Sequence, residues 1–163
     1  MNSFIDPNIE RKKYIVDNYI SSNPEIYSGI PAFSIIEFNI SELCNRRCFF
    51  CPRIDPNVYP NRNVSISVEL YTKIMSELKD MSFSGRIIYS AFSEPLLHKK
   101  LNTLILLSKS YCPESSVEIV TNGDLLHAKE LERFFSSGLD TISVSMYDGP
   151  EQIPYFTKIR ERC

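Results

Sequence analysis

From residue 33 onward, the chain alternates short runs of β-branched and aromatic residues with longer stretches whose apolar residues recur every three or four positions. The short runs predict strands and the longer stretches predict amphipathic helices. The predicted strands are 33–41, 87–89, 117–121 and 141–146, and the predicted helices are 67–78, 99–111, 131–135 and 153–159. Alternation with short connections favours parallel strands joined by right-handed crossovers. The predicted class is therefore α/β, with about four strand–helix units.

Single residues mark two of the predicted helix boundaries. Ser67 precedes an apolar face that includes Tyr71, Met75 and Leu78, and serine is a favoured N-cap residue. Gly138 follows another apolar stretch, and glycine commonly stands just past the end of a helix. These two residues predict where one helix begins and where another ends.

A further helix is expected ahead of this pattern, because residues 8–21 carry apolar side chains at helix-like spacing. Pro24 and Pro31 then interrupt the spacing. We predict an N-terminal helical extension over residues 1–31 and a core domain over residues 32–163. Because four units cannot close a barrel, we expect a truncated core, or a sheet whose open edge is covered by something else.

The composition narrows the classes of function. The chain has 18 lysines and arginines against 20 aspartates and glutamates, a net charge of −2. Nucleic-acid binding is not expected, since it requires a basic surface. No apolar stretch resembles a signal peptide or approaches the roughly 20 residues that a membrane helix needs. We therefore expect a cytoplasmic protein without a membrane partner, in which thiols stay reduced.

Three of the five cysteines lie in one short segment. Cys44, Cys48 and Cys51 form a C-x3-C-x2-C pattern directly after the first predicted strand. The odd number and the clustering argue against a disulfide framework and favour a metal site. Thiolates are the soft ligands of iron–sulfur clusters, and three of them can hold three corners of a cubane. The fourth iron would then have no protein ligand from this segment.

Two other interpretations of the cysteine pattern remain open, namely a structural zinc site and chance. A structural zinc ion usually has four protein ligands. Cys112 is a candidate for the fourth, but it is expected after a helix and away from the strand ends. His98 and His127 are isolated in the sequence, as surface or packing histidines usually are.

With an aromatic residue before its third cysteine, the segment LCNRRCFFCPR resembles the signature loop of the radical S-adenosylmethionine (SAM) superfamily. The resemblance implies that Cys44, Cys48 and Cys51 bind a [4Fe–4S] cluster whose open iron is chelated by the methionyl amine and carboxylate of SAM. It also implies reductive cleavage of SAM to a 5′-deoxyadenosyl radical, which abstracts hydrogen from a substrate. Transferred by position, Phe50 would lie against the adenine.

Three other strand ends carry residues that resemble the family's SAM-binding segments. The segment SAFSEPLL is similar to the family's Gly-Gly-Glu motif, so Glu94 would receive the methionyl ammonium. Asn122, in Thr-Asn-Gly, would contact the ribose or carboxylate. Ser145, or Ser143 on the same strand face, would hold the methionyl carboxylate. Alternatively, Glu94 is a surface acid at a turn and Asn122 is a turn residue.

The chain departs from the family pattern in the second of these segments. Ala91, Phe92 and Ser93 stand where glycines are usual, and glycine permits close backbone approach. The departure puts the detailed contact with the methionyl amine in doubt.

The resemblance further implies a fold, cofactors and partners. The fold would be a partial parallel (β/α) barrel of the radical SAM type, an incomplete TIM-like barrel truncated from about six units to four. Cys163 would be the first of the C-terminal cysteines that mark the SPASM-type group, although one cysteine does not decide this. The partners would be an unidentified substrate and an electron donor of the flavodoxin or ferredoxin type. The catalytic residues and the substrate are not identifiable from the sequence.

Two hypotheses of function follow. In the first, the chain is a radical SAM enzyme, or its cofactor-binding part, acting on an unknown substrate. In the second, it is an inactive, truncated remnant that binds an iron–sulfur cluster or zinc as a structural or partner-binding module. The replaced glycines favour the second hypothesis, and the ordered set of motifs favours the first.

Overall fold

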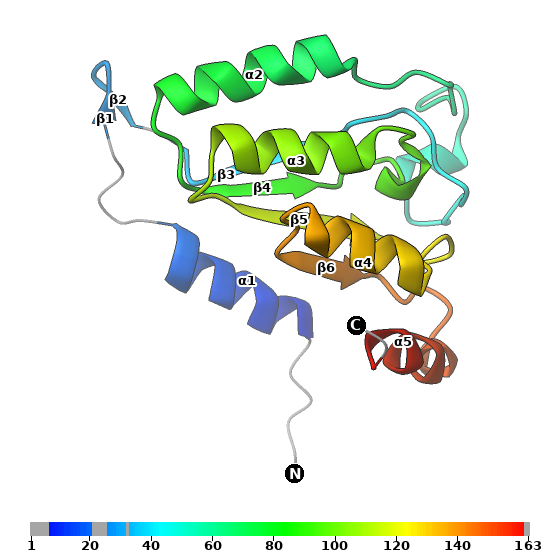
Figure 1. The fold of residues 1–163 in the computed structure, drawn as a ribbon. Helices are drawn as coiled ribbons and strands as arrows, with labels where there is room; N and C mark the ends of the chain where they lie inside the picture. The colour runs from blue at the N-terminus through cyan, green and yellow to red at the C-terminus, as the bar shows by residue number, and fades with distance from the viewer. Residues whose placement is uncertain (1–6, 21–25, 32, 162–163) are drawn as a thin grey trace.

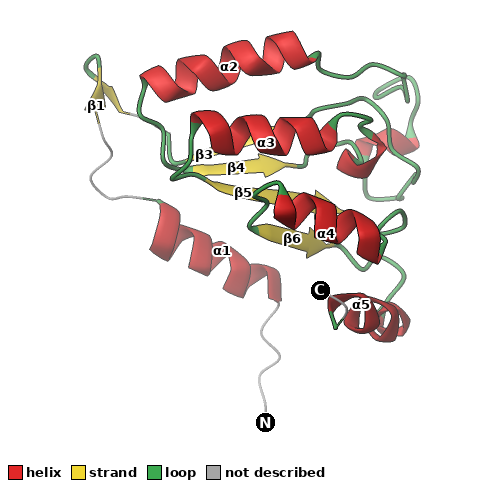
Figure 2. Cartoon of the chain, viewed as in Figure 1, coloured by secondary structure: helices red, strands yellow, loops and turns green. Residues whose placement is uncertain are grey.

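The computed structural model describes residues 7–20, 26–31 and 33–161. Five α-helices, three single-turn 3-10 helices and six strands lie in this part of the chain (Figures 1 and 2). The helices are α1 (Pro7–Tyr19), α2 (Val68–Asp80), α3 (Leu101–Tyr111), α4 (Ala128–Ser136) and α5 (Ile153–Arg160). The strands are β1 (Ile26–Tyr27), β2 (Ile30–Pro31), β3 (Ile35–Phe38), β4 (Arg86–Tyr89), β5 (Ser116–Thr121) and β6 (Thr141–Val144).

The four longer strands form one parallel sheet in the order β3-β4-β5-β6. This arrangement confirms the predicted α/β class, with strands and helices alternating along the chain. Strand β3 is shorter than predicted, because the chain leaves β4 beyond Phe38. The carbonyl of Ile40 instead accepts a hydrogen bond from the returning Ile66 amide, and Ser41 pairs with Ser65. These contacts hold together the two ends of the long loop between β3 and α2.

Helices α2, α3 and α4 cover one face of the sheet (Figure 1). Alternation along each strand sends residues such as Ile87 and Val117 into this layer, where both are fully buried beside Leu104 of α3. The hydroxyls of Tyr71, Tyr89 and Ser108 bond to one another at 2.6–2.8 Å inside the same layer. Burial of these groups raises the pKa of Tyr71 to about 12, so the network is neutral.

Both predicted helix boundaries are confirmed. Ser67 is the N-cap of α2, and its hydroxyl accepts a hydrogen bond from the Leu70 amide at 3.1 Å. Gly138 follows α4 with a φ of +96°, a conformation that residues with a Cβ rarely adopt. These boundaries were predictable because they depend on one residue and its immediate neighbours.

The opposite face of the sheet carries charged side chains. Glu118 of β5 is buried and accepts hydrogen bonds from Arg86 of β4, from Ser143 of β6 at 2.5 Å and from Arg11 of α1 at 2.9 Å. Helix α1, which confirms the helix predicted ahead of the core, lies on this side of the sheet (Figure 1). Since a buried carboxylate is costly without partners, these three donors account for its placement. The division into an extension and a core at residue 31 stays a prediction.

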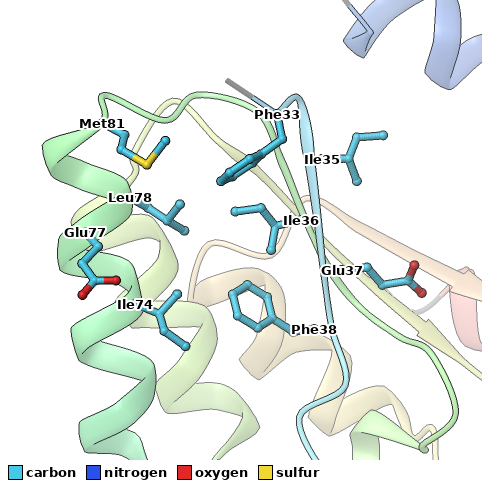
Figure 3. A pocket seen from close by; sticks show the side chains of 9 residues that line it. All are labelled: Phe33, Ile35, Ile36, Glu37, Phe38, Ile74, Glu77, Leu78 and Met81. Atoms are coloured by element: carbon cyan, nitrogen blue, oxygen red, sulfur yellow. The ribbon is translucent and has the colours of Figure 1, made fainter. Parts of the chain in front are cut away.

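An apolar groove of about 480 Å³ lies between the edge strand β3 and helix α2. Figure 3 shows Phe33, Ile36 and Phe38 facing Ile74 and Leu78 across it. Its only charged lining groups are two glutamates, Glu37 and Glu77, and it contains no cysteine. We therefore regard this groove as part of the packing between strand and helix.

In the ranges that the structure describes, no helix is both long and apolar enough to cross a membrane. The cytoplasmic location stays a prediction.

Candidate functional site

The candidate site is built on the loop between β3 and α2. Cys44, Cys48 and Cys51 are free and half-buried on this loop. The Cys51 amide donates to the Cys48 carbonyl at 2.9 Å, and a single 3-10 turn begins directly after Cys51. Burial raises the pKa of the Cys44 thiol, while the Arg46 amide, 3.4 Å from Cys44 Sγ, acts in the opposite direction.

The far side of the loop is tied back to the cysteine segment. Asn61 accepts from the Cys44 amide at 2.9 Å and donates to the Cys44 carbonyl at 3.2 Å. Arg53 is buried, and its guanidinium donates to Asn61 at 3.0 Å, to the Glu42 carbonyl at 2.5 Å and to the Phe92 carbonyl. Arg53 therefore fixes the loop against the segment that follows β4.

Glu94 joins three elements at the carboxyl ends of the strands. Its carboxylate accepts from the Thr121 hydroxyl at 2.6 Å, from the Asn122 amide at 2.9 Å and from the Leu96 amide at 3.0 Å. Its own amide donates to the Leu43 carbonyl at 2.8 Å. Burial raises the pKa of Glu94, and these hydrogen bonds oppose the shift. Since Glu94 is only 1% exposed, the alternative that it is a surface acid is wrong.

The segment before Glu94 keeps a glycine-like backbone without a glycine. Ala91 has a φ of +74°, in the left-handed region that normally favours glycine. Its side chain is exposed, so the strain at this position comes from its own backbone and not from packing against neighbours. Ala91 therefore keeps the left-handed backbone conformation that a glycine would adopt at this position.

Asn122 and Gly123 follow β5 as the Thr-Asn-Gly motif predicted. The Asn122 side chain donates to Asn45 of the cysteine loop at 2.8 Å and accepts from the Asp124 amide at 3.0 Å. Gly123 has a φ of +78°, and a Cβ there would lie 2.5 Å from the Phe156 ring. Asn122 thus forms the turn and also links β5 to the cysteine loop.

The structure separates Ser143 and Ser145, the two serines that the sequence proposed as ligands. Ser143 donates to Glu118 at 2.5 Å and so belongs to the charged face of the sheet. Ser145 follows the strand, and its amide donates to the Thr121 carbonyl at 2.8 Å. Ser145 therefore lies beside the end of β5, where Glu94 and Asn122 also meet.

Phe50 lies against a residue that the sequence did not single out. Its ring is 5.2 Å from the Tyr147 ring, centroid to centroid, and both side chains are about half-exposed. The two rings line a hollow of about 400 Å³ beside Cys48. The other residues that line this hollow are Arg46, Arg47, Phe49 and Asp148.

Arg46 is the second contributor that sequence reasoning missed. Its guanidinium makes paired hydrogen bonds with Asp124 at 2.5 and 2.7 Å and with Asp148 at 2.7 and 3.0 Å. These bonds raise the pKa of Arg46, and Arg46 in turn lowers the pKa of Asp124. The only available signal was opposite charge at strand ends, which is too common to predict a contact.

The donor set fits a cluster held by three cysteines. Among the described residues, no three His, Cys, Asp or Glu side chains, the three loop cysteines included, are already arranged to hold a metal ion. His98 is buried and contacts Ile66 and Lys100, while Cys112 is buried beyond α3. Three free thiols on one loop supply the soft donors, and the number of ligands, for a cubane with one open iron.

The family match agrees with this geometry. Residues 38–163 match the model of the radical SAM superfamily. The chain is 33% identical over 119 residues to the S-adenosyl-L-methionine-dependent 2-deoxy-scyllo-inosamine dehydrogenase of Niallia circulans, a match that covers 72% of this chain and 46% of that protein. It is 29% identical over 111 residues to the GTP 3′,8-cyclase of Chlorobaculum tepidum, a match that covers 68% of this chain and 32% of that protein. The chain therefore spans less than half the length of these relatives.

Two solved structures are similar to this chain in fold. A crystal structure of BtrN in complex with AdoMet and 2-DOIA is similar with a TM-score of 0.70 and 28% identity, covering 80% of this chain and 55% of BtrN. A crystal structure of BtrN in an open conformation is similar with a TM-score of 0.64 and 31% identity, covering 74% of this chain and 53% of BtrN. These similarities confirm the predicted partial barrel.

The SPASM-type group stays a prediction, and Cys163, the residue on which it rests, lies outside the described residues. The family uses a [4Fe–4S] cluster and SAM, which are the two cofactors that the cysteine loop predicted. Since the match begins in β3 and runs to residue 163, this protein belongs to the radical SAM superfamily.

Proposed function

We propose that this chain binds a [4Fe–4S] cluster through Cys44, Cys48 and Cys51 and takes part in the reductive cleavage of SAM. The observation that carries the proposal is three free thiols on a loop that is tied to the ends of β4 and β5. When bound, the cluster supplies one electron that breaks the C5′–S bond of SAM, giving methionine and a 5′-deoxyadenosyl radical. The residues of the chain hold and orient the two cofactors.

The roles proposed for the SAM-binding residues follow from what each one already contacts. Phe50 and Tyr147 offer exposed ring faces on which a purine base can stack. Glu94 already accepts three hydrogen bonds, from Leu96, Thr121 and Asn122, so its proposed role is to hold the Ala91–Ser93 backbone in place, and that backbone would receive the methionyl ammonium. Ser145 and Asn122 remain the proposed contacts for the methionyl carboxylate and the ribose.

The proposal extends to a substrate and a reductant. The relative from Niallia circulans is named as a dehydrogenase of 2-deoxy-scyllo-inosamine, so this amino alcohol is the first substrate to test. Its oxidation would remove two hydrogens, one as an atom taken by the 5′-deoxyadenosyl radical and one as a proton, and the remaining electron would return to the [4Fe–4S] cluster, which cleavage of SAM had oxidised. A flavodoxin or ferredoxin is the proposed source of the electron that reduces the cluster.

An anaerobic assay tests the proposal. The chain is reconstituted with iron and sulfide, reduced with dithionite and supplied with SAM, and 5′-deoxyadenosine is quantified by chromatography. We expect product from the wild-type chain and none from the Cys48→Ala variant, which loses one cluster ligand. The Cys112→Ala variant is the matched control, because Cys112 lies beyond α3 and should leave cluster content and product unchanged.

The same assay separates the proposal from the alternative of an inactive module. A reducible cluster in a chain that binds no SAM and forms no product would favour the module. Full iron content and normal cleavage in Cys48→Ala would refute the ligand assignment.

A further inference from the structure

Arg46 connects three loops that are far apart in the sequence. It lies between Cys44 and Cys48, and it is 78 and 102 residues from its partners Asp124 and Asp148. Asp124 follows β5, and Asp148 follows β6. The guanidinium uses Nε and both terminal nitrogens, so each carboxylate receives two hydrogen bonds. We call this set of three residues the Arg46 clamp.

The geometry of the Arg46 clamp separates it from ordinary surface ion pairs. Exposed pairs usually contribute little, because water screens them and long side chains lose freedom. The Arg46 side chain, however, is only 17% exposed, and Asp124 is 30% exposed. Paired bonds from one guanidinium to a carboxylate are among the strong, direction-specific interactions in proteins. We therefore expect the Arg46 clamp to order all three loops.

The Arg46 clamp also sets the shape of the hollow beside Cys48. Tyr147 immediately precedes Asp148, and the Arg46 guanidinium carbon lies 5.9 Å from the centre of its ring. On the other side, Phe50 is four residues from Arg46 on the cysteine loop and contacts Tyr147 at 5.2 Å. The two aromatic walls of the hollow therefore come from the two segments that the Arg46 clamp joins.

We propose that Arg46 is a positioning residue, which fixes the Phe50 and Tyr147 rings relative to the cysteine loop and so sets the affinity for the nucleoside of SAM. The claim that SAM is the ligand rests on the proposed function. The claim that Arg46 orders the loops and the two rings does not. Arg46 acts through Asp124, Asp148 and Tyr147, and it needs no contact with SAM to do so.

The first test uses the chain without cofactors. Hydrogen exchange of backbone amides is compared among the wild type, Arg46→Met and Arg62→Met. Arg62 is the matched control, because it lies on the same loop and makes a paired bond with Glu42 at 2.6 and 2.9 Å, away from the hollow. We expect Arg46→Met to speed exchange several-fold in both residues 43–51 and residues 145–149. Equal exchange in wild type and Arg46→Met would overturn the proposal.

The second test measures SAM binding to the reconstituted chain with its cluster oxidised, so that no cleavage occurs. We expect Arg46→Met to keep full iron and sulfide content but to bind SAM about tenfold more weakly, as expected when charge-assisted bonds that order a binding surface are lost. Arg46→Lys keeps the charge without the paired geometry and should fall between the two. Wild-type SAM affinity in Arg46→Met, despite faster exchange, would refute the positioning role.

Asp148→Asn keeps the proposal testable if Arg46→Met does not fold. Asp148 is 62% exposed, so its substitution weakens half of the Arg46 clamp at little cost to folding. Exchange in residues 145–149 should then rise, whereas unchanged exchange there would count against the Arg46 clamp. If the wild-type chain itself binds no SAM, the proposed function fails, and the exchange comparison still decides whether the Arg46 clamp orders the loops.

Discussion

The helix-covered face of the sheet is stabilised by one kind of interaction, and the loops at its carboxyl ends by another. In the helix layer, Ile87, Leu104 and Val117 are fully buried and contact one another through apolar surface. At the carboxyl ends, Arg46 and Glu94 connect the loops through hydrogen bonds and ion pairs. Apolar burial is non-directional, whereas hydrogen bonds require defined geometry.

This difference suggests a division of roles. The helix layer should supply most of the free energy of folding, because buried apolar area is the dominant favourable contribution. The loops should contribute less to the free energy of unfolding, but they should decide how the thiols and the residues proposed to bind SAM are placed. If so, substitutions in the two regions will have separable effects on stability and on cofactor binding.

The largest expected effect tests the helix layer. Leu104→Ala removes a fully buried side chain from α3, and such truncations cost about 2–5 kcal/mol of unfolding free energy. Chemical denaturation measures the loss, and iron content per folded chain should stay at the wild-type level. Leu106→Ala is the control on the same helix, because Leu106 is 47% exposed and should change stability by less than about 0.5 kcal/mol. A variant that folds but loses its cluster would break the division of roles.

The second effect tests the loops. Glu94→Gln replaces a carboxylate that accepts three hydrogen bonds with an amide whose nitrogen must face a donor. Leaving buried donors unsatisfied costs about 1–3 kcal/mol. Denaturation measures this loss, and SAM affinity should fall as well because the Ala91–Ser93 backbone moves. Glu114→Gln, at an exposed turn, serves as the control. An unchanged SAM affinity would show that the segment does not depend on Glu94.

Glu94 also predicts a pH dependence. Burial raises its pKa in the folded chain, so the folded state binds the proton more readily than the unfolded state does. Its contribution to stability is therefore full below the unfolded pKa of about 4.3 and is lost as the pH rises through the higher folded value. The difference in unfolding free energy between wild type and Glu94→Gln should shrink across that window. A difference that grows with pH would mean that hydrogen bonding outweighs burial at this carboxyl.

The sequence predicted the helix layer better than the loops, for a physical reason. Helix periodicity, the Ser67 cap and Gly138 depend on residues that are close in sequence, and the structure confirms them. The contact of Arg46 with Asp148 spans 102 residues, and no local pattern encodes it.

The same distinction applies within the candidate site. The spacing of the three cysteines is local and indicated the cluster loop. Two of the three partners of Glu94 lie at the end of a different strand, so neither its burial nor its contacts with Thr121 and Asn122 were predictable. The family resemblance and strand alternation together grouped Ser143 with Ser145, and only the contact of Ser143 with Glu118 separates them.

The smallest expected effect concerns the backbone before Glu94. Ala91 has a φ of +74°, and a non-glycine residue in this region is less stable by about 1–2 kcal/mol than in its usual conformations. Ala91→Gly removes that strain but adds about 0.4–1 kcal/mol of unfolded-state entropy, so stability should rise by at most about 1.6 kcal/mol. Because the left-handed conformation is already present, SAM affinity should not fall.

A substitution of the same kind in α4 supplies the matched control. Ala128 begins that helix, where glycine is less favourable than alanine by up to about 1 kcal/mol, so Ala128→Gly should lower stability. Opposite signs for the two substitutions, read from denaturation midpoints under identical conditions, would show that the loop holds a glycine conformation with an alanine. If both substitutions lowered stability, the strain at Ala91 would be smaller than its angle indicates. Ala91 would then stabilise the fold relative to glycine. The loops would contribute more to stability than the division between a stabilising helix layer and a positioning loop region allows.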